Sequence, residues 1–201
     1  MTSLSIRNDH SRMSALIALV ALTWGVAVAV SSSTGLLARI PMPLIALLVG
    51  LGIALPTLWY FVSESLRAWT EAVGLRAITA FHIWRIPAAM LFFFYGIRGE
   101  LPAVFWIVAG TGDLIAGCYA AWVVTRKTPS ADQYLRMHRF GFADFVVAVG
   151  TGLTFTLLLN PKMALIATLP FALIPLYGVG ISGASHIIAF DMLRRKGARD
   201  N

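Results

Sequence analysis

Six long apolar runs constrain the fold of this chain more than any other feature of its sequence. They cover residues 13–30, 43–62, 77–97, 101–124, 140–159 and 163–190. A helix rises about 1.5 Å per residue, so roughly 20 apolar residues cross a hydrocarbon core of about 30 Å. Because lipid offers no hydrogen bonds to the backbone, spans of this length are expected to be helical. We predict an all-α, polytopic membrane bundle of six transmembrane helices, forming one domain over residues 1–201.

The composition supports a membrane protein rather than a soluble one. Charged residues make up 12% of the chain and hydrophobic residues 58%, whereas soluble domains carry about 25% charged residues. The net charge of +7 does not indicate a nucleic-acid partner, because the basic residues are dispersed between the apolar runs. The expected partner is the lipid bilayer. Cys118 is the single cysteine, so no intrachain disulfide can form.

The distribution of lysine and arginine predicts the orientation. With a cytoplasmic N-terminus, twelve of the sixteen basic residues fall in the four cytoplasmic segments. The outer loops then hold only Arg39, Arg98 and Lys162. Since cytoplasmic loops are enriched in lysine and arginine, we predict that both termini are cytoplasmic.

Three local patterns refine this picture. Residues 7–33 also resemble a signal peptide, with Arg12 before the apolar run and Ala27-Val28-Ala29 near its end, but we expect the segment to be retained as a span. Residues 63–76 place apolar side chains at helical spacing among charges, which favours a short helix in the interface. Thr128 followed by Pro129 predicts the N-cap of a helix that leads into the fifth span.

Five ionisable residues lie inside the predicted spans, namely His82, Arg85, Asp113, Asp144 and His186. Such residues are costly in a bilayer and mark either a functional site or an internal pair. Each shares a helical face with small residues, where membrane helices pack closely. We predict that Arg85, Asp113 and Asp144 form a polar centre in the cytoplasmic half. The alternative is an Arg85–Asp113 ion pair that only ties two helices together.

The positions along the spans suggest two layers. Arg85 and Asp113 are expected about 12 and 16 Å from the cytoplasmic face, at about 1.5 Å per helical residue. His82, Asp144 and His186 are expected nearer that face, at roughly 6–8 Å.

The two histidines inside spans allow two cofactor hypotheses. His82 and His186 could supply both axial ligands of a b-type haem. Alternatively, they could bind a metal ion together with Asp144; the identity of such a metal is unknown. His138 falls at the cytoplasmic start of the fifth run and is not included in either set.

Several functions therefore stay open. The first is transport or permeation of a proton, an ion or a small polar solute through the polar centre. The second is an accessory or assembly subunit, acting as a homo-oligomer or within a larger membrane complex. The third is a small haem- or metal-binding redox protein. No motif identifies a reaction, so we do not predict an enzyme, although Asp113 or Asp144 could act as acid or base.

Several short motifs resemble a family of uncharacterised bacterial multi-pass membrane proteins over residues 44–180. They are His82-x-Trp84-Arg85, Leu101-Pro102-x-x-Phe105, Ala109-Gly110-x-Gly112-Asp113 and Asp144-x-Val146-Val147-Ala148. That family has no established activity, so the resemblance supports the membrane fold and assigns no site residue. It implies a bacterial inner (plasma) membrane location.

Overall fold

The computed structural model describes residues 3–199 and, over that range, contains helices and turns but no strand. The helices are α1 (Ser3–Ser33), α2 (Met42–Val62), α3 (Glu64–Phe81), α4 (Arg85–Ile97), α5 (Ala103–Thr125), α6 (Ala131–Leu157) and α7 (Val179–Arg199). Six segments are long and apolar enough to cross a membrane: His10–Ser33, Met42–Val62, Glu64–Ile97, Ala103–Thr125, Ala131–Leu157 and Ile174–Ala198. The predicted all-α bundle of six membrane helices is confirmed.

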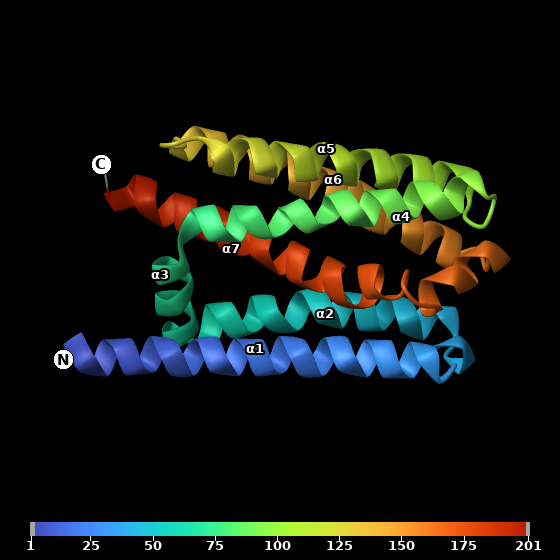
Figure 1. Cartoon of the computed structure of the whole chain (residues 1–201), viewed down its shortest axis with the longest axis horizontal. Coiled ribbons are helices and arrows are strands. Elements are labelled where there is room, and N and C mark those ends of the chain that lie inside the picture. The colour runs from blue at the N-terminus through green and yellow to red at the C-terminus, as the bar shows by residue number, and fades with distance from the viewer. Residues whose placement is uncertain (1–2, 200–201) are drawn as a thin grey trace.

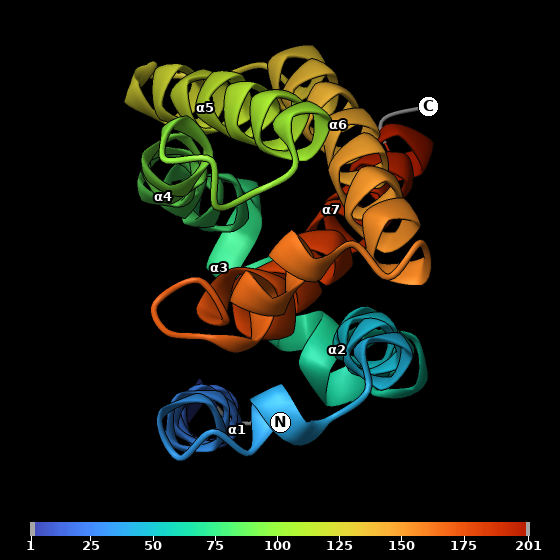
Figure 2. The same ribbon diagram turned by 90° about the vertical axis from the view of Figure 1, so that its right-hand side faces the viewer.

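The helices form an elongated bundle with α7 in its middle (Figures 1 and 2). Helices α1 and α2 lie on one side of α7, and α4, α5 and α6 lie on the other. Helices α4 and α5 form an antiparallel hairpin through a short turn at Gly99, whose φ of 75° favours glycine. Their contact is close because a Cβ at Gly117 would lie 2.7 Å from Ile86 Cγ1.

The third span enters the bundle through a bend. The Ser63 side chain caps α3 by accepting a hydrogen bond from the Leu66 amide at 3.2 Å. Gly74, with φ of 79° and ψ of 161°, then interrupts the helical backbone. The first part of α3 lies across the end of the bundle (Figure 1) and makes residues 64–73 helical. The chain continues through the 3-10 turn η2 (His82–Trp84) into α4, so the third span changes helix type where it carries His82.

Helix α6 begins later than Thr128 and much earlier than the predicted span. Its N-cap is Ser130, not Thr128, because Ser130 and Gln133 form a reciprocal capping box. The helix starts at Ala131, whereas the fifth apolar run starts at residue 140. His138 therefore lies two turns inside a helix.

The sixth predicted span, 163–190, is not one continuous helix. The chain forms the 3-10 turn η3 (Pro161–Ala167), an irregular stretch with a cis Leu169–Pro170 bond, and the π-helical turn η4 (Ile174–Gly178) before α7. Irregular backbone at membrane depth is tolerated where it is buried in protein or lines a cavity. Here Phe171 and Ala172 are buried.

Helix α1 supplies hydrogen bonds to this irregular segment. Trp24 Nε1 donates to the Leu176 carbonyl at 2.6 Å, and Ser32 Oγ donates to the Ala167 carbonyl at 2.9 Å. The Tyr177 ring packs against α1 at Gly25, with Tyr177 Cε2 3.5 Å from an ideal Cβ at that position. The first span therefore contacts the irregular segment before α7 through hydrogen bonds, although most of its own surface is exposed.

Candidate functional site

The three residues of the predicted polar centre are in contact. Arg85 is the first residue of α4 and is only 2% exposed. Its Nε donates to Asp113 Oδ1 on α5 at 2.6 Å, and its Nη2 donates to Asp144 Oδ2 on α6. Its Nη1 donates to the Gly141 carbonyl at 3.1 Å. One guanidinium therefore joins three spans.

Small residues make this approach of three helices feasible. A Cβ at Gly112 would overlap the Asp144 carboxylate, so only glycine leaves room for that side chain beside α5. Asp144 thus reaches the same layer as Arg85, rather than the histidine layer in which its sequence position had placed it. Arg85 and Asp144 meet because the arginine side chain is long. It extends from Arg85, which lies deeper in the bundle, towards the Asp144 carboxylate.

The charges of this centre do not cancel. Two carboxylates, Asp113 and Asp144, share one guanidinium, and the three side chains are at most 12% exposed. When all three groups are ionised, the centre has one excess negative charge. An uncompensated charge away from water is costly, so the centre favours a proton, a cation or a hydrogen-bond donor as its neighbour.

A second polar cluster contains three histidines, and two of them were predicted from the sequence as possible haem or metal ligands. His82 on η2, His138 on α6 and His186 on α7 are each 0% exposed. One ligand nitrogen from each lies within 4.8 Å of the others. His138 Nδ1 and His186 Nδ1 are 2.9 Å apart and share a hydrogen bond. Because α6 starts at Ala131, His138 lies within the bundle and replaces Asp144 as the third member of a candidate metal set.

The two clusters meet at Gly141. An ideal Cβ on Gly141 would lie 2.6 Å from His186 Cε1, 3.0 Å from His186 Nε2 and 3.4 Å from Arg85 Nη1. The absence of a side chain at this position lets the His186 ring and the Arg85 guanidinium come together. The histidines and the Arg85 centre form adjacent layers in the bundle.

The histidine geometry does not fit a b-type haem with His82 and His186 as axial ligands. In such a haem the iron and the porphyrin lie between the two ligating nitrogens. The two rings instead stack with their centroids 4.0 Å apart and their planes at 23°. That face-to-face contact leaves no space for a macrocycle between the two ligating nitrogens.

A cavity of about 210 Å³ adjoins the Arg85 centre. Its walls come from α2, α4, α5, α6 and the irregular segment before α7, and they are predominantly apolar. Arg85, Asp113 and Ser182 line it with polar groups. The Thr156 hydroxyl also lines it but already donates to the Gly152 carbonyl at 2.8 Å. The free polarity of the cavity is therefore concentrated near Arg85.

The cavity reaches the lipid-facing surface between α2 and α6. Gly50 of α2 and Leu153 of α6 both line it, and both are exposed. A molecule dissolved in the bilayer could enter by this route without crossing an aqueous loop.

A family model described as a domain of unknown function (DUF8737) matches residues 41–194. No curated protein and no solved structure matches the chain. The match includes the Arg85 centre, the three buried histidines and the cavity-lining residues, and it excludes α1.

Proposed function

The chain belongs to the DUF8737 family, and we propose that it binds an amphiphilic molecule from the membrane, with the apolar body in the cavity and a polar end at Arg85 and Asp113. The observation that carries this proposal is a single cavity with apolar walls whose polar groups cluster at a buried ion pair. Ligand sites typically combine apolar walls with a few convergent polar groups.

The size of the cavity limits what enters it. A cavity of about 150 Å³ accommodates a benzene-sized ligand. The cavity of about 210 Å³ therefore has room for one ring or a short branched chain. A longer apolar tail would extend between α2 and α6 into the bilayer. These apolar walls favour an amphiphile over the small polar solute or ion that the sequence suggested as cargo.

The charge of the site selects the polar end of the ligand. Arg85 is already bound to Asp113, Asp144 and the Gly141 carbonyl. Each nitrogen of the Arg85 guanidinium already donates a hydrogen bond, and the other charged residue that lines the cavity is Asp113, so an anionic headgroup is disfavoured. A hydroxyl or amine, which donates hydrogen bonds, is complementary to this end of the cavity.

Filling the cavity is expected to abolish binding. The probe is a long-chain alcohol carrying a photoreactive diazirine, irradiated with the detergent-purified protein and located by peptide mass spectrometry. Wild type should be labelled on α2 and α6 beside the cavity. Ala148→Phe should lose most of this labelling, because Ala148 lines the cavity and a phenyl ring would fill it.

The matched control is Ala143→Phe, the same change on an exposed position of α6. It should label like wild type. The corresponding fatty-acid probe should label the cavity more weakly than the alcohol. Equal labelling of Ala148→Phe and Ala143→Phe, or preference for the acid, would contradict the proposal.

We also propose that both termini are cytoplasmic in a bacterial inner membrane, as the distribution of basic residues indicates. Lys127 lies in the α5–α6 loop and Lys162 lies after α6, and both are exposed. In a Cys118→Ser background, a membrane-impermeant maleimide added to intact cells should label Lys162→Cys and spare Lys127→Cys. Both should react after permeabilisation. Labelling of Lys127→Cys but not of Lys162→Cys in intact cells would show the opposite topology, with both termini outside the cytoplasm.

A further inference from the structure

We propose that His82, His138 and His186 form a binding site for one divalent transition-metal ion of the Zn²⁺ type. The site lies beside the Arg85 centre and is independent of the ligand cavity. It uses three neutral nitrogen ligands from three separate elements: the turn η2, α6 and α7.

The hydrogen bonds of His82 define its tautomer and leave one ring nitrogen free to bind a metal ion. The Ser185 hydroxyl donates its proton to the Ser182 carbonyl at 2.9 Å. It can therefore only accept from His82 Nε2, which lies 3.1 Å away. His82 then carries its proton on Nε2, and its Nδ1 keeps a free lone pair. That Nδ1 is buried and has no hydrogen-bond partner among residues 3–199.

His138 is held in a comparable way. Its Nε2 lies 3.1 Å from the Thr79 hydroxyl, and its Nδ1 faces His186 Nδ1 at 2.9 Å. Histidines that bind metal ions typically donate their second ring nitrogen to a fixed acceptor, which sets the tautomer. Ser185 and Thr79 occupy that position for His82 and His138. The hydroxyls thus leave one nitrogen of each ring directed at the cluster.

The spacing of the three nitrogens is close to that around one bound ion. Zn–N bonds of about 2.0–2.1 Å in a tetrahedron place ligand nitrogens roughly 3.4 Å apart. Here His138 and His186 are closer than that, and the three ligand nitrogens lie within 4.8 Å of one another. The His82 and His186 rings are stacked, with centroids 4.0 Å apart, so one of them must rotate out of the stack before the in-plane lone pairs of all three nitrogens point at one ion. Imidazole ligands suit Zn²⁺, Cu²⁺ and Ni²⁺.

The surroundings are compatible with a cation. Three neutral imidazoles add no charge of their own, and His186 Nε2 is a second buried nitrogen without a hydrogen-bond partner among the described residues. The charged group nearest the cluster is the Arg85 guanidinium, and two carboxylates, Asp113 and Asp144, offset its positive charge, so it does not exclude a divalent ion from the site.

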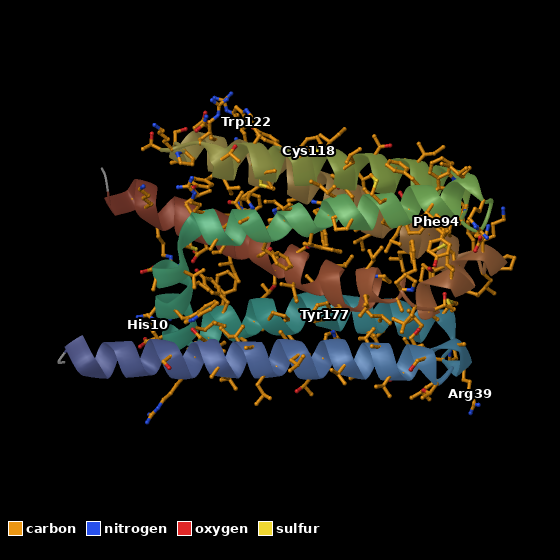
Figure 3. All side chains as sticks on the ribbon, in the orientation of Figure 1. His10, Arg39, Phe94, Cys118, Trp122 and Tyr177 are labelled. Carbon is orange, nitrogen blue, oxygen red and sulfur yellow. The ribbon has the colours of Figure 1, made fainter. Side chains whose placement is uncertain are left out.

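Metal content after incubation with Zn²⁺ and removal of unbound ion tests the site directly, on full-length protein without a polyhistidine tag. Wild type should retain one Zn²⁺ per chain by elemental mass spectrometry. His138→Ala should retain none. His10→Ala is the matched control, because His10 is the one histidine of the sequence outside the cluster and lies near the N-terminal end of α1 (Figure 3), and it should behave as wild type.

A second variant keeps the test decisive if His138→Ala does not fold. Ser185→Ala retains all three ligands and removes only the acceptor for His82, so Zn²⁺ affinity should fall about 10- to 100-fold. Wild type should also bind Co²⁺ with the visible absorption of a tetrahedral site. No Zn²⁺ retained by wild type, or equal retention by wild type and the folded His138→Ala, would overturn the proposal.

Discussion

Arg85→Leu should be the most destabilising single substitution in the polar centre. It removes the shared partner of Asp113 and Asp144 and leaves two carboxylates without a counter-charge. Breaking a buried ion pair by removing one partner costs about 3–5 kcal/mol. The free energy of unfolding of the detergent-solubilised protein should fall by about this amount. Thermal or denaturant unfolding followed by circular dichroism would measure it.

An exposed arginine provides the control. Arg98 Nε lies 2.6 Å from Glu100 Oε1, but the Arg98 side chain is 60% exposed. Exposed pairs contribute at most about 1 kcal/mol, so Arg98→Leu should change little. Replacing Arg85, Asp113 and Asp144 together by leucine should recover much of the stability lost in Arg85→Leu. Equal effects of Arg85→Leu and Arg98→Leu would show that the centre does not stabilise the bundle.

Apolar run length was sufficient to predict the number of spans and their approximate positions. Lipid forces each long apolar segment to satisfy its own backbone, so length alone predicts a helix. The turn around Gly99 is too short to connect distant helices, which accounts for the antiparallel pairing of α4 and α5. Interior faces were also predictable, because Asp113 shares its helical face with small residues that are buried in the structure.

Hydropathy could not predict where the last span is helical. Residues 163–173 are as apolar as a membrane-spanning helix, but Pro170 and Pro175 interrupt helical hydrogen bonding. The carbonyls in this segment are satisfied partly by Trp24 and Ser32 of α1, which are distant in sequence. No local pattern contains that information.

The histidine cluster was only half predicted, for a related reason. A helix leading from Thr128 into the fifth span was predicted, but His138 lies before the apolar run that starts at residue 140, so it was not counted among the residues inside spans. The capping box at Ser130 starts α6 at Ala131 and places His138 two turns inside the helix. Asp144 was predicted to belong to the polar centre, but its position along the fifth span placed it at the depth of the histidines. The length of the Arg85 side chain, which reaches Asp144, was not taken into account.

Gly112→Ala should separate Asp144 from Arg85. A Cβ at this position would overlap the Asp144 carboxylate, so the side chain or α6 must move. Overpacking of this kind typically costs about 1–3 kcal/mol. Gly150→Ala is the control, because nothing lies within 4 Å of an ideal Cβ there, and it should cause no loss of stability. Unfolding free energies of the two variants give the comparison.

The double variant Gly112→Ala/Asp144→Ala identifies the cause of the Gly112→Ala effect. If the new methyl group acts by displacing the Asp144 carboxylate, then Asp144→Ala makes room for it. The cost of Gly112→Ala should then almost vanish in the Asp144→Ala background, a strongly non-additive result. Additive effects would mean that Gly112 serves the packing of α5 against α6 in general. Non-additivity would show that this glycine is required because the third member of the charged centre occupies the space beside it.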